Sequence, residues 1–251
     1  MIKITNLHKS FGEQPVLRGI DLAIPDGETI AIIGQSGCGK SVLLKLMIGL
    51  MKPDDGEITI DGVSMGKAKE RQLEQVRLHI GFLFQGAALF DSMTVLENVT
   101  LGLKEHGERN PDVLAKIAAE KLALVGLHGI EQRTPVELSG GMKKRVALAR
   151  ALATDPKYVL YDEPTTGLDP VTSDQIDNLV RDLTARLRVT SIIVTHDLFT
   201  VERIAKRVVF LNKGKIYFDG TPDELYKSLD VAVMQFLQRY RTPVAAAVAT
   251  S

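Results

Sequence analysis

Residues 29–49 combine an apolar run, a glycine-rich loop and a helix start, and this succession restricts the fold more than any other part of the chain. The run Thr29 to Ile33 is unbroken, which is typical of a strand buried on both faces. Gly34 to Ser41 reads GQSGCGKS and leads into SVLLKLMIGL, which closes at Gly49. A doubly buried strand that feeds a helix in this way predicts an α/β fold with helices on both faces of a sheet.

The loop itself predicts phosphate binding. Glycines let successive backbone N–H groups turn inward towards phosphate oxygens, and the N-terminus of the following helix adds its dipole. In such a loop Lys40 reaches the β- and γ-phosphates, and the hydroxyl of Ser41 binds Mg²⁺. The residues predicted to hold the nucleotide here are Gly34, Gln35, Ser36, Gly37, Cys38, Gly39, Lys40, Ser41 and Val42.

Composition limits the classes of function. The 251 residues are 45% hydrophobic and 25% charged, as in an ordinary globular protein of one large or two modest domains. Lys and Arg number 31, as do Asp and Glu, so nothing in the net charge favours a nucleic-acid partner, and none is predicted. Cys38 is the single cysteine, so no intrachain disulfide can form. No apolar run approaches the roughly 20 residues of a spanning helix, so we expect work at a membrane to go through a partner.

The rest of the chain continues the alternation of strands and helices, with one interruption. Residues 86–137 carry a capping box from Thr94 to Glu97 and apolar positions at helical spacing over 111–125, and they predict a helical insertion between two core strands. Alternating strands and helices predict a mainly parallel sheet. The other predicted elements are strands at 2–5, 16–24, 79–85, 158–162 and 191–195, helices at 111–125 and 172–187, and a hairpin at 208–218.

Polar residues stand where three of these strands end. Asp162 and Glu163 follow the strand YVLY, Gln85 ends FLFQ, and His196 ends SIIVTH. Carboxyl ends of parallel strands meet at the edge of the sheet where open α/β folds bind ligands. We therefore expect these four side chains to lie together beside the phosphate loop.

A second glycine-rich helix start occurs about a hundred residues after the first, in the string LSGGMKKRVALARAL. Ser139 can cap a helix that begins at Gly140, and Gly140 and Gly141 leave its first amides open to an anion. In a chain that already holds phosphates elsewhere, the residues alone give no use for such a second anion site.

Taken together, these motifs resemble those of the ATP-binding cassette (ABC) family, and the resemblance covers residues 1–225. It implies a P-loop NTPase core with a mainly parallel sheet, an N-terminal antiparallel β portion and a helical insertion. It also implies that Asp162 positions Mg²⁺ through water, that Glu163 polarises the attacking water, and that Gln85 senses metal and water. His196 then contacts the γ-phosphate.

The same resemblance implies an ATP-sandwich homodimer. Ser139, Gly140 and Gly141 bind the γ-phosphate held by the second copy, and Asp169 lies in the loop that crosses to that copy. Phe11 stands where the family places an aromatic ring against adenine. The residue after the two glycines is usually Gln in the family and is Met142 here, which removes one side chain able to hydrogen-bond nucleotide.

Two stretches, FLFQGAALFDSMTVLENV and LSGGMKKRVALARAL, resemble the ATPases of Mla/Mce-type phospholipid transport systems. This likeness implies an integral-membrane permease, an Mce-domain lipid-binding protein and a small STAS-domain subunit as partners. It places the chain at the cytoplasmic face of the inner membrane, peripheral through the permease. Two alternatives stay open: an ABC importer ATPase for a polar solute, and a non-transport ABC module of cell division.

Two apolar segments are candidates for contacts with other proteins. After Gln85, the cluster Ala87, Ala88, Leu89, Phe90 and Met93 is interpreted either as a permease contact or as packing within the insertion. Residues 1–228 are predicted to form the ATPase domain, with 229–251 as a tail that makes an interface or is disordered. In that tail, one helical face is predicted to make the interface through Val233, Phe236, Leu237 and Tyr240.

Overall fold

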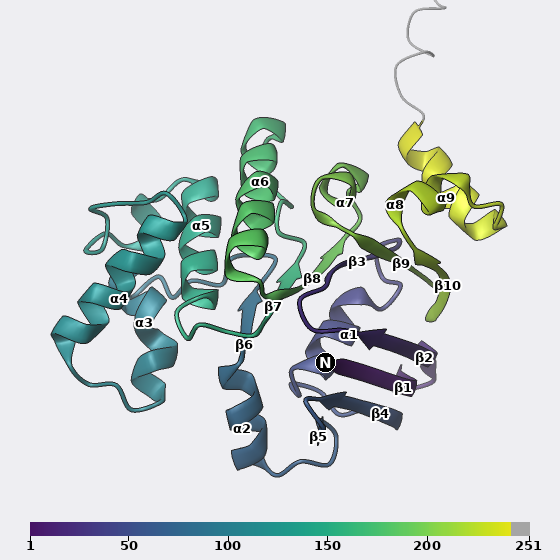
Figure 1. Ribbon diagram of the computed structural model, residues 1–251, viewed down its shortest axis with the longest axis horizontal. Helices are drawn as coiled ribbons and strands as arrows, with labels where there is room; N and C mark the ends of the chain where they lie inside the picture. Colours follow the sequence, from purple (N-terminus) through teal and green to yellow (C-terminus); the bar gives the residue numbers. More distant parts are fainter. Residues whose placement is uncertain (242–251) are drawn as a thin grey trace, which may run out of the picture.

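The computed structural model describes residues 1–241, and within them the strands form two sheets (Figure 1). The smaller sheet is antiparallel and has the order β2-β1-β4-β5. It is built from β1 (Ile2–Phe11), β2 (Gln14–Ile24), β4 (Asp55–Ile60) and β5 (Val63–Ser64). The N-terminal strands predicted from the sequence are therefore present, and β1 runs further than the predicted 2–5.

The larger sheet has the order β10-β9-β3-β8-β7-β6 and is parallel except for its edge strand β10. Every residue of β3, β7 and β8 is buried, because helices cover both faces of the sheet. Its strands are β3 (Thr29–Ile33), β6 (Ile80–Leu83), β7 (Tyr158–Asp162), β8 (Thr190–Thr195), β9 (Arg207–Asn212) and β10 (Lys215–Gly220). The predicted α/β class with a mainly parallel sheet is confirmed.

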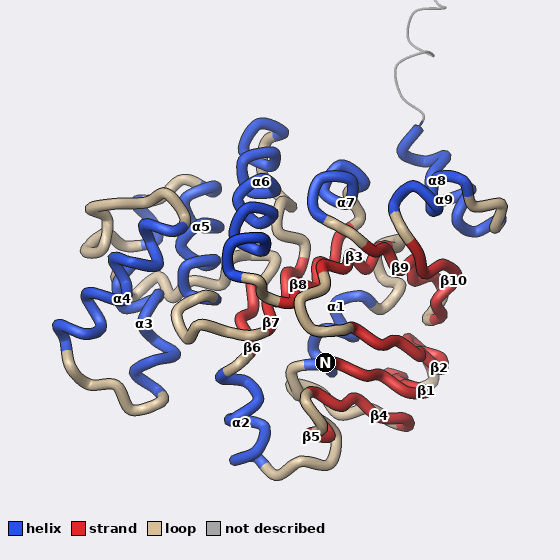
Figure 2. The backbone as a smooth tube through the Cα atoms, in the orientation of Figure 1, coloured by secondary structure: helices blue, strands red, loops and turns tan. Residues whose placement is uncertain are grey.

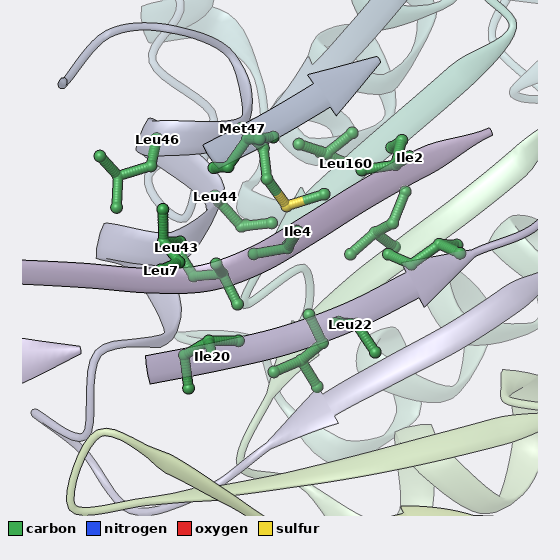
Figure 3. Packing of buried hydrophobic residues seen from close by; sticks show 14 of the residues in the cluster. Ile2, Ile4, Leu7, Ile20, Leu22, Leu43, Leu44, Leu46, Met47 and Leu160 are labelled. Carbon is green, nitrogen blue, oxygen red and sulfur yellow. The ribbon is translucent and has the colours of Figure 1, made fainter. Parts of the chain in front are cut away.

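Helix α1 (Lys40–Met47) lies between the two sheets, and the core of this half forms around it. Leu43, Leu44, Leu46 and Met47 of α1 are at most 1% exposed. Figure 3 shows these side chains packed against Ile2, Ile4, Leu7, Ile20 and Leu22 of the antiparallel sheet and Leu160 of β7. This burial fixes the start of α1, and with it the phosphate loop, relative to both sheets.

Helices gather at the other end of the molecule (Figure 2). Between β6 and β7 the chain forms α3 (Val95–Glu105), α4 (Pro111–Leu124), the 3-10 turn η1 (Pro135–Glu137) and α5 (Gly140–Ala151). The capping box is confirmed, since Thr94 and Glu97 exchange hydrogen bonds at the start of α3. Helix α5 shares a hydrophobic cluster with α3 and α4 although it begins after residue 137. The proposed limits of the insertion, 86 and 137, stay a prediction.

The remaining helices cover the larger sheet and its edge. They are α2 (Glu70–Leu78), α6 (Pro170–Leu187), α7 (Leu198–Ile204), α8 (Pro222–Lys227) and α9 (Val231–Arg241). None of the helices in residues 1–241 combines the length and the apolar character that crossing a membrane demands.

Helix α9 corrects the prediction for the apolar face of the tail. Val233, Phe236 and Leu237 are at most 4% exposed, because they pack on Ile33 and Phe210 of the chain's own sheet. The ring of Phe236 lies 4.9 Å from that of Phe210. This face is therefore core within one chain and is not available to a partner. Residues 242–251 of the predicted interface, and the side chain predicted at position 240, lie outside what the structure describes.

Candidate active site

The loop from Gly34 to Gly39 joins β3 to α1 with so little room that two of its positions require glycine. A Cβ atom at Gly34 would lie 2.1 Å from the main-chain oxygen of Leu211, and one at Gly39 would lie 2.7 Å from Cδ2 of Leu17. Gly39 also has a φ of 111°, in the left-handed region. The glycines of the motif thus let the loop pack directly on its neighbours, with α1 beginning immediately behind it.

Lys40 lies along the inner side of this loop. Its side chain is 7% exposed, and Nζ donates to the main-chain oxygens of Gly34 at 2.7 Å and Gln35 at 3.2 Å. The same Nζ lies 3.9 Å from Oε1 of Glu163. An ammonium held by carbonyl oxygens can exchange these contacts for the charged oxygens of a phosphate, which bind it more strongly.

Ser41 and Asp162 meet where α1 and β7 come together. The hydroxyl of Ser41 donates to Oδ1 of Asp162 over 2.9 Å. Burial of Asp162 is the largest cause of a raised pKa of its carboxyl group, which the hydrogen bond from Ser41 partly offsets.

This pair fits a magnesium ion that is bound together with a nucleotide. Carboxylate and hydroxyl oxygens are ligands that Mg²⁺ prefers, and a cation beside Asp162 would favour its ionised form. Across residues 1–241, no group of three or more His, Cys, Asp and Glu side chains is arranged to hold a metal by itself. Mg²⁺ typically uses one or two protein ligands and completes its shell with phosphate oxygens and water.

Glu163 follows β7 and is held from several sides. Its Oε2 accepts a hydrogen bond from Nδ1 of His196 at 2.8 Å and one from the hydroxyl of Thr166 at 3.2 Å. The residue is only 8% exposed, whereas the side chain of His196 is 45% exposed. A carboxylate oriented by a histidine and close to Lys40 is suited to accept a proton from a water molecule at the phosphate end of the site.

A cavity of about 470 Å³ joins most of the predicted residues. Its walls come from the end of β1, the phosphate loop, α1, and the chain that follows β6, β7 and β8. The predicted residues that line it are Phe11, Ser36, Gly37, Gly39, Lys40, Ser41, Val42, Gln85, Glu163 and His196. The structure thus brings together side chains that are up to 185 positions apart in the chain, counting from Phe11 to His196.

Phe11, the last residue of β1, also lines this cavity. Its side chain is 47% exposed, and Nζ of Lys9 lies 5.7 Å from the centre of its ring. An aromatic face that is still accessible is able to stack on a base. Val16 lines the same part of the cavity and was not predicted, because in the sequence it reads only as the start of a strand.

The second glycine-rich start lines no part of this cavity. Oγ of Ser139 accepts a hydrogen bond from the backbone N–H of Met142 at 3.3 Å, so the predicted cap of α5 is confirmed. Asp169 caps α6 by accepting from the backbone N–H of Thr172 at 3.0 Å. The two helix starts lie close together, since a Cβ at Gly141 would be 2.7 Å from Cγ2 of Thr172.

Cys38 points into the protein rather than towards the cavity. Its side chain is 9% exposed, and its Sγ would lie 2.7 Å from a Cβ at Gly34. Burial raises the pKa of its thiol. Cys38 therefore supports the loop through packing. Its backbone N–H can bind a phosphate, but its thiol cannot.

Two groups near the site, the half-buried Thr166 and the buried Lys144, gave no signal in the sequence. Thr166 contacts the carboxylate of Glu163, and Lys144 of α5 donates to the main-chain oxygen of Gln85. Lys144 is one of several basic residues in MKKRVALARAL, and helical periodicity alone does not show which of them is buried. Its inward direction depends on how α5 packs against β6, a tertiary property.

Several known proteins are similar in sequence to this chain over most of its length. The ABC transporter family matches residues 17–166. The Arabidopsis thaliana chloroplast protein TRIGALACTOSYLDIACYLGLYCEROL 3 is 42% identical over 94% of this chain and 73% of its own length. The intermembrane phospholipid transport system ATP-binding protein MlaF of Haemophilus influenzae is 39% identical over 95% of this chain and 90% of its own. The methionine import ATP-binding protein MetN of Mesorhizobium japonicum is 41% identical over 88% and 60%.

A solved structure agrees with these similarities. The dimeric post-hydrolysis state of the ATP-binding cassette MJ0796, bound to ADP and Pi, matches with a TM-score of 0.81 and 34% identity, over 88% of this chain and 99% of that one. Fold, phosphate loop and sequence similarity therefore lead to the same assignment. The chain belongs to the ABC transporter family and is an ATP-hydrolysing subunit of that family.

Proposed function

We propose that this ATPase drives phospholipid trafficking between the inner and outer membranes of a Gram-negative-type envelope. The main support is the similarity to MlaF, which extends over 95% of this chain and 90% of that intermembrane phospholipid transport protein. Met142 supports the same proposal, because it departs from the glutamine usual in the wider family and lies in the stretch LSGGMKKRVALARAL, which resembles the Mla/Mce-type ATPases.

In this proposal the chain works at the cytoplasmic face of the inner membrane, attached through an integral-membrane permease. Two copies form the ATP-sandwich homodimer, and an Mce-domain lipid-binding protein and a small STAS-domain subunit complete the assembly. The dimeric state of the similar cassette MJ0796 supports the pairing of two copies.

The site residues have distinct roles in the proposed reaction. The amides from Gly34 to Ser41 and Nζ of Lys40 bind the phosphates, while Ser41, Gln85 and Asp162 hold Mg²⁺ directly or through water. Glu163 accepts a proton from the attacking water, and His196 orients Glu163 and contacts the γ-phosphate. The geometry that supports this division is the hydrogen bond from His196 to Glu163 and the short path from Glu163 to Lys40.

The proposed permease contact lies in the loop after β6. Ala87 is 4% exposed and belongs to the core, which agrees with the interpretation of this segment as packing within the insertion. Phe90 is 49% exposed, and Ala88 beside it is also exposed. Asn98 of α3 holds the loop by accepting from the backbone N–H of Phe90 at 2.8 Å and donating to three carbonyl oxygens. A rigid loop that presents an aromatic side chain is a suitable docking point.

An importer for a polar solute is the second candidate, and the 41% identity to MetN favours it. The chemistry at the nucleotide would be the same in both cases, since cargo specificity belongs to other subunits. The match covers only 60% of MetN, whereas 90% of MlaF is covered, and this difference favours the phospholipid proposal.

The deciding experiment purifies the assembled complex from detergent extract through a tag on this chain and reconstitutes it into phospholipid vesicles. We expect a permease and an Mce-domain protein to co-purify, and fluorescent phospholipid to move between vesicles and the Mce protein only with Mg-ATP. Co-purification with a solute-binding protein, and ATP hydrolysis stimulated by a polar solute, would overturn the proposal.

A matched pair of variants tests the permease contact in the same preparation. Phe90→Ser should weaken the association with the permease while the isolated subunit keeps its ATPase rate, because Phe90 does not line the nucleotide cavity. Leu187→Ser is the control, since Leu187 is also exposed, at 36%, but lies at the end of α6. Equal permease recovery with both variants would exclude Phe90 from the interface.

A further inference from the structure

Helix α5 carries a buried lysine for which the proposed reaction has no use. Lys144 lies one turn after Ser139–Gly141, and its side chain is 5% exposed. Its Nζ donates to the main-chain oxygen of Gln85 and, at 3.4 Å, to that of Glu163. No carboxylate oxygen within residues 1–241 lies at ion-pairing distance from this ammonium. Burying such a charge is costly, and its cost is offset here by carbonyl dipoles rather than by a counter-ion.

The surrounding negative charges favour the protonated form of Lys144. Burial lowers the pKa of Lys144, and the nearby negative charges of Asp162 and Glu163 oppose that shift. The lysine thus lies close to the two carboxylates but does not line the nucleotide cavity.

One carbonyl oxygen held by Lys144 belongs to a residue in an unfavourable backbone conformation. Glu163 has a φ of 51°, in the left-handed region, which costs a non-glycine residue about 1–2 kcal/mol. Such a conformation persists only where the surroundings determine it. Here the N–H of Glu163 donates to Val194 at 2.8 Å, while its oxygen accepts from Lys144 and, at 3.3 Å, from the N–H of Thr166.

The other carbonyl oxygen belongs to the loop that follows β6. Ala87 and Ala88 of this loop also have positive φ values, of 63° and 49°. Arg150, further along α5, donates to both of their carbonyl oxygens at 2.7 Å. Two cations of α5 therefore fix the loop, but only Lys144 also reaches Glu163.

We propose that Lys144 is a positioning residue for ATP hydrolysis, which holds Glu163 and Gln85 in a fixed relation to each other and to the start of α5. This inference rests on the roles proposed above for Glu163 and Gln85. Lys144 does not touch the nucleotide. It acts through the main-chain oxygens of Gln85 and Glu163. A displacement of the loop that bears Phe90 therefore changes the position of the Glu163 carboxylate.

Replacing Lys144 by methionine keeps most of its volume and removes the donor. In the assembled transporter we expect kcat for ATP to fall roughly 10- to 100-fold, since displacing a catalytic group by about 1 Å costs this much. The KM for ATP should change by less than about threefold, because the phosphate loop is untouched. Lys144→Arg, which can still donate to both carbonyl oxygens, should restore most of kcat.

Lys121 provides a matched control for the loss of a buried lysine. It is 8% exposed, lies on α4, and donates to Asp155, away from the nucleotide cavity. Lys121→Met should lower the melting temperature but leave kcat per folded protein unchanged. If Lys144→Met does not fold, Lys144→Gln gives a second comparison, because it removes the charge and its shorter side chain does not bring a donor to both carbonyl oxygens.

A double-mutant cycle with Glu163→Gln separates a positioning role from an independent one. If Lys144 acts through Glu163, adding Lys144→Met to Glu163→Gln should lower the residual single-turnover rate by less than about twofold. Full multiplication of the two losses, or wild-type kcat in Lys144→Met alone, would overturn the inference. Wild-type turnover in Glu163→Gln alone would instead reject the proposed roles on which it rests.

Discussion

The two glycine-rich helix starts of this chain differ in where their neighbours lie. The first, Gly34–Ser41, lines a cavity together with Gln85, Glu163 and His196, which follow three strands of the larger sheet. The second, Ser139–Gly141, lines no part of that cavity. Its helix, α5, instead contacts the main-chain oxygens of Gln85 and Glu163 through Nζ of Lys144. Both starts offer free amides to an anion. The difference teaches that the first start has polar strand ends of its own chain around it, while the second has only its support in one chain and its predicted ligand in another copy.

Substitution of Glu163 should separate binding from hydrolysis more sharply than any other change. Glu163→Gln keeps the size of the side chain but cannot accept the proton of the attacking water, and loss of general-base help costs roughly 10²- to 10⁴-fold. Both glycine-rich starts stay intact, so we expect an ATP-bound dimer to accumulate. Turnover, bound nucleotide and mass after incubation with Mg-ATP measure this.

Lys40→Ala is the opposing control for that experiment. It removes the ammonium that lies along the first start, so nucleotide affinity and the closed dimer should be lost together. A Glu163→Gln protein that turns over ATP like the wild type would remove Glu163 from the chemistry. A dimer that forms equally well with Lys40→Ala would show that nucleotide does not join the two copies.

The second start is tested by a pair of helix caps with the same geometry. Oγ of Ser139 and Oγ1 of Thr221 each accept from a backbone N–H at 3.3 Å, at the starts of α5 and α8. Either change to alanine should cost about 0.5–1 kcal/mol of stability, the usual value of a cap. Only Ser139→Ala should also lower kcat, by roughly tenfold or more, as expected for a lost donor to transition-state charge. Equal turnover in both variants, measured at saturating ATP, would mean that Ser139 is a cap and nothing else.

Sequence reasoning placed residues correctly in the fold where the signal is a local pattern. The phosphate loop, the strand ends at Asp162 and His196, and the cap at Ser139 each have a short signal whose geometry follows from a strand end or a helix start. The predicted strand at 79–85 was too long, because β6 ends at Leu83 and the chain turns before Gln85. Apolar residues continue past the end of the strand there, so periodicity alone gives no boundary.

It failed where the direction of a side chain is decided by tertiary packing. Phe236 and Phe90 are both apolar residues in segments interpreted as possible interfaces, yet one is fully buried and the other is half exposed. The first meets Phe210, which is 26 positions away, and no local pattern encodes that contact. Lys144 is the same case for a charged residue, since its partners come from two other loops.

A smaller effect, on stability, is expected from a change at Asp177. This residue lies on α6, the helix whose start packs against Gly141. Asp177 is 1% exposed, accepts from the hydroxyl of Thr200 of α7, and has no partner for Oδ1. Burial raises the pKa of its carboxyl from 3.8 to about 6. Because the folded pKa is the higher one, the folded state binds the proton more tightly. The associated stability is full at low pH and is lost as the pH rises from about 4 through 6.

Asp177→Asn should therefore stabilise the protein at pH 7.5 by about 1–2 kcal/mol, since ionising a buried carboxyl no longer opposes folding. At pH 4 the two proteins should unfold at nearly the same denaturant concentration, and turnover should be unchanged. Urea unfolding at both pH values measures the difference. A wild-type protein as stable as the variant at pH 7.5 would show that the carboxylate is solvated or paired in solution.

The smallest effect is expected for the exchange of adenine for guanine in the nucleotide bound at the first start, measured as the ratio of ATP to GTP hydrolysis. Phe11, which lines the cavity, offers a base an aromatic face but no hydrogen bond. Stacking is worth about 1–3 kcal/mol and tolerates any base. Discrimination above about a hundredfold requires a buried hydrogen-bond partner that one base satisfies and the other does not. We expect GTP to be hydrolysed within about a hundredfold of ATP, and Phe11→Leu to weaken both nucleotides alike. A larger preference for ATP in competition kinetics would contradict this expectation, and would point to the second copy as the source of a hydrogen-bond partner for the base.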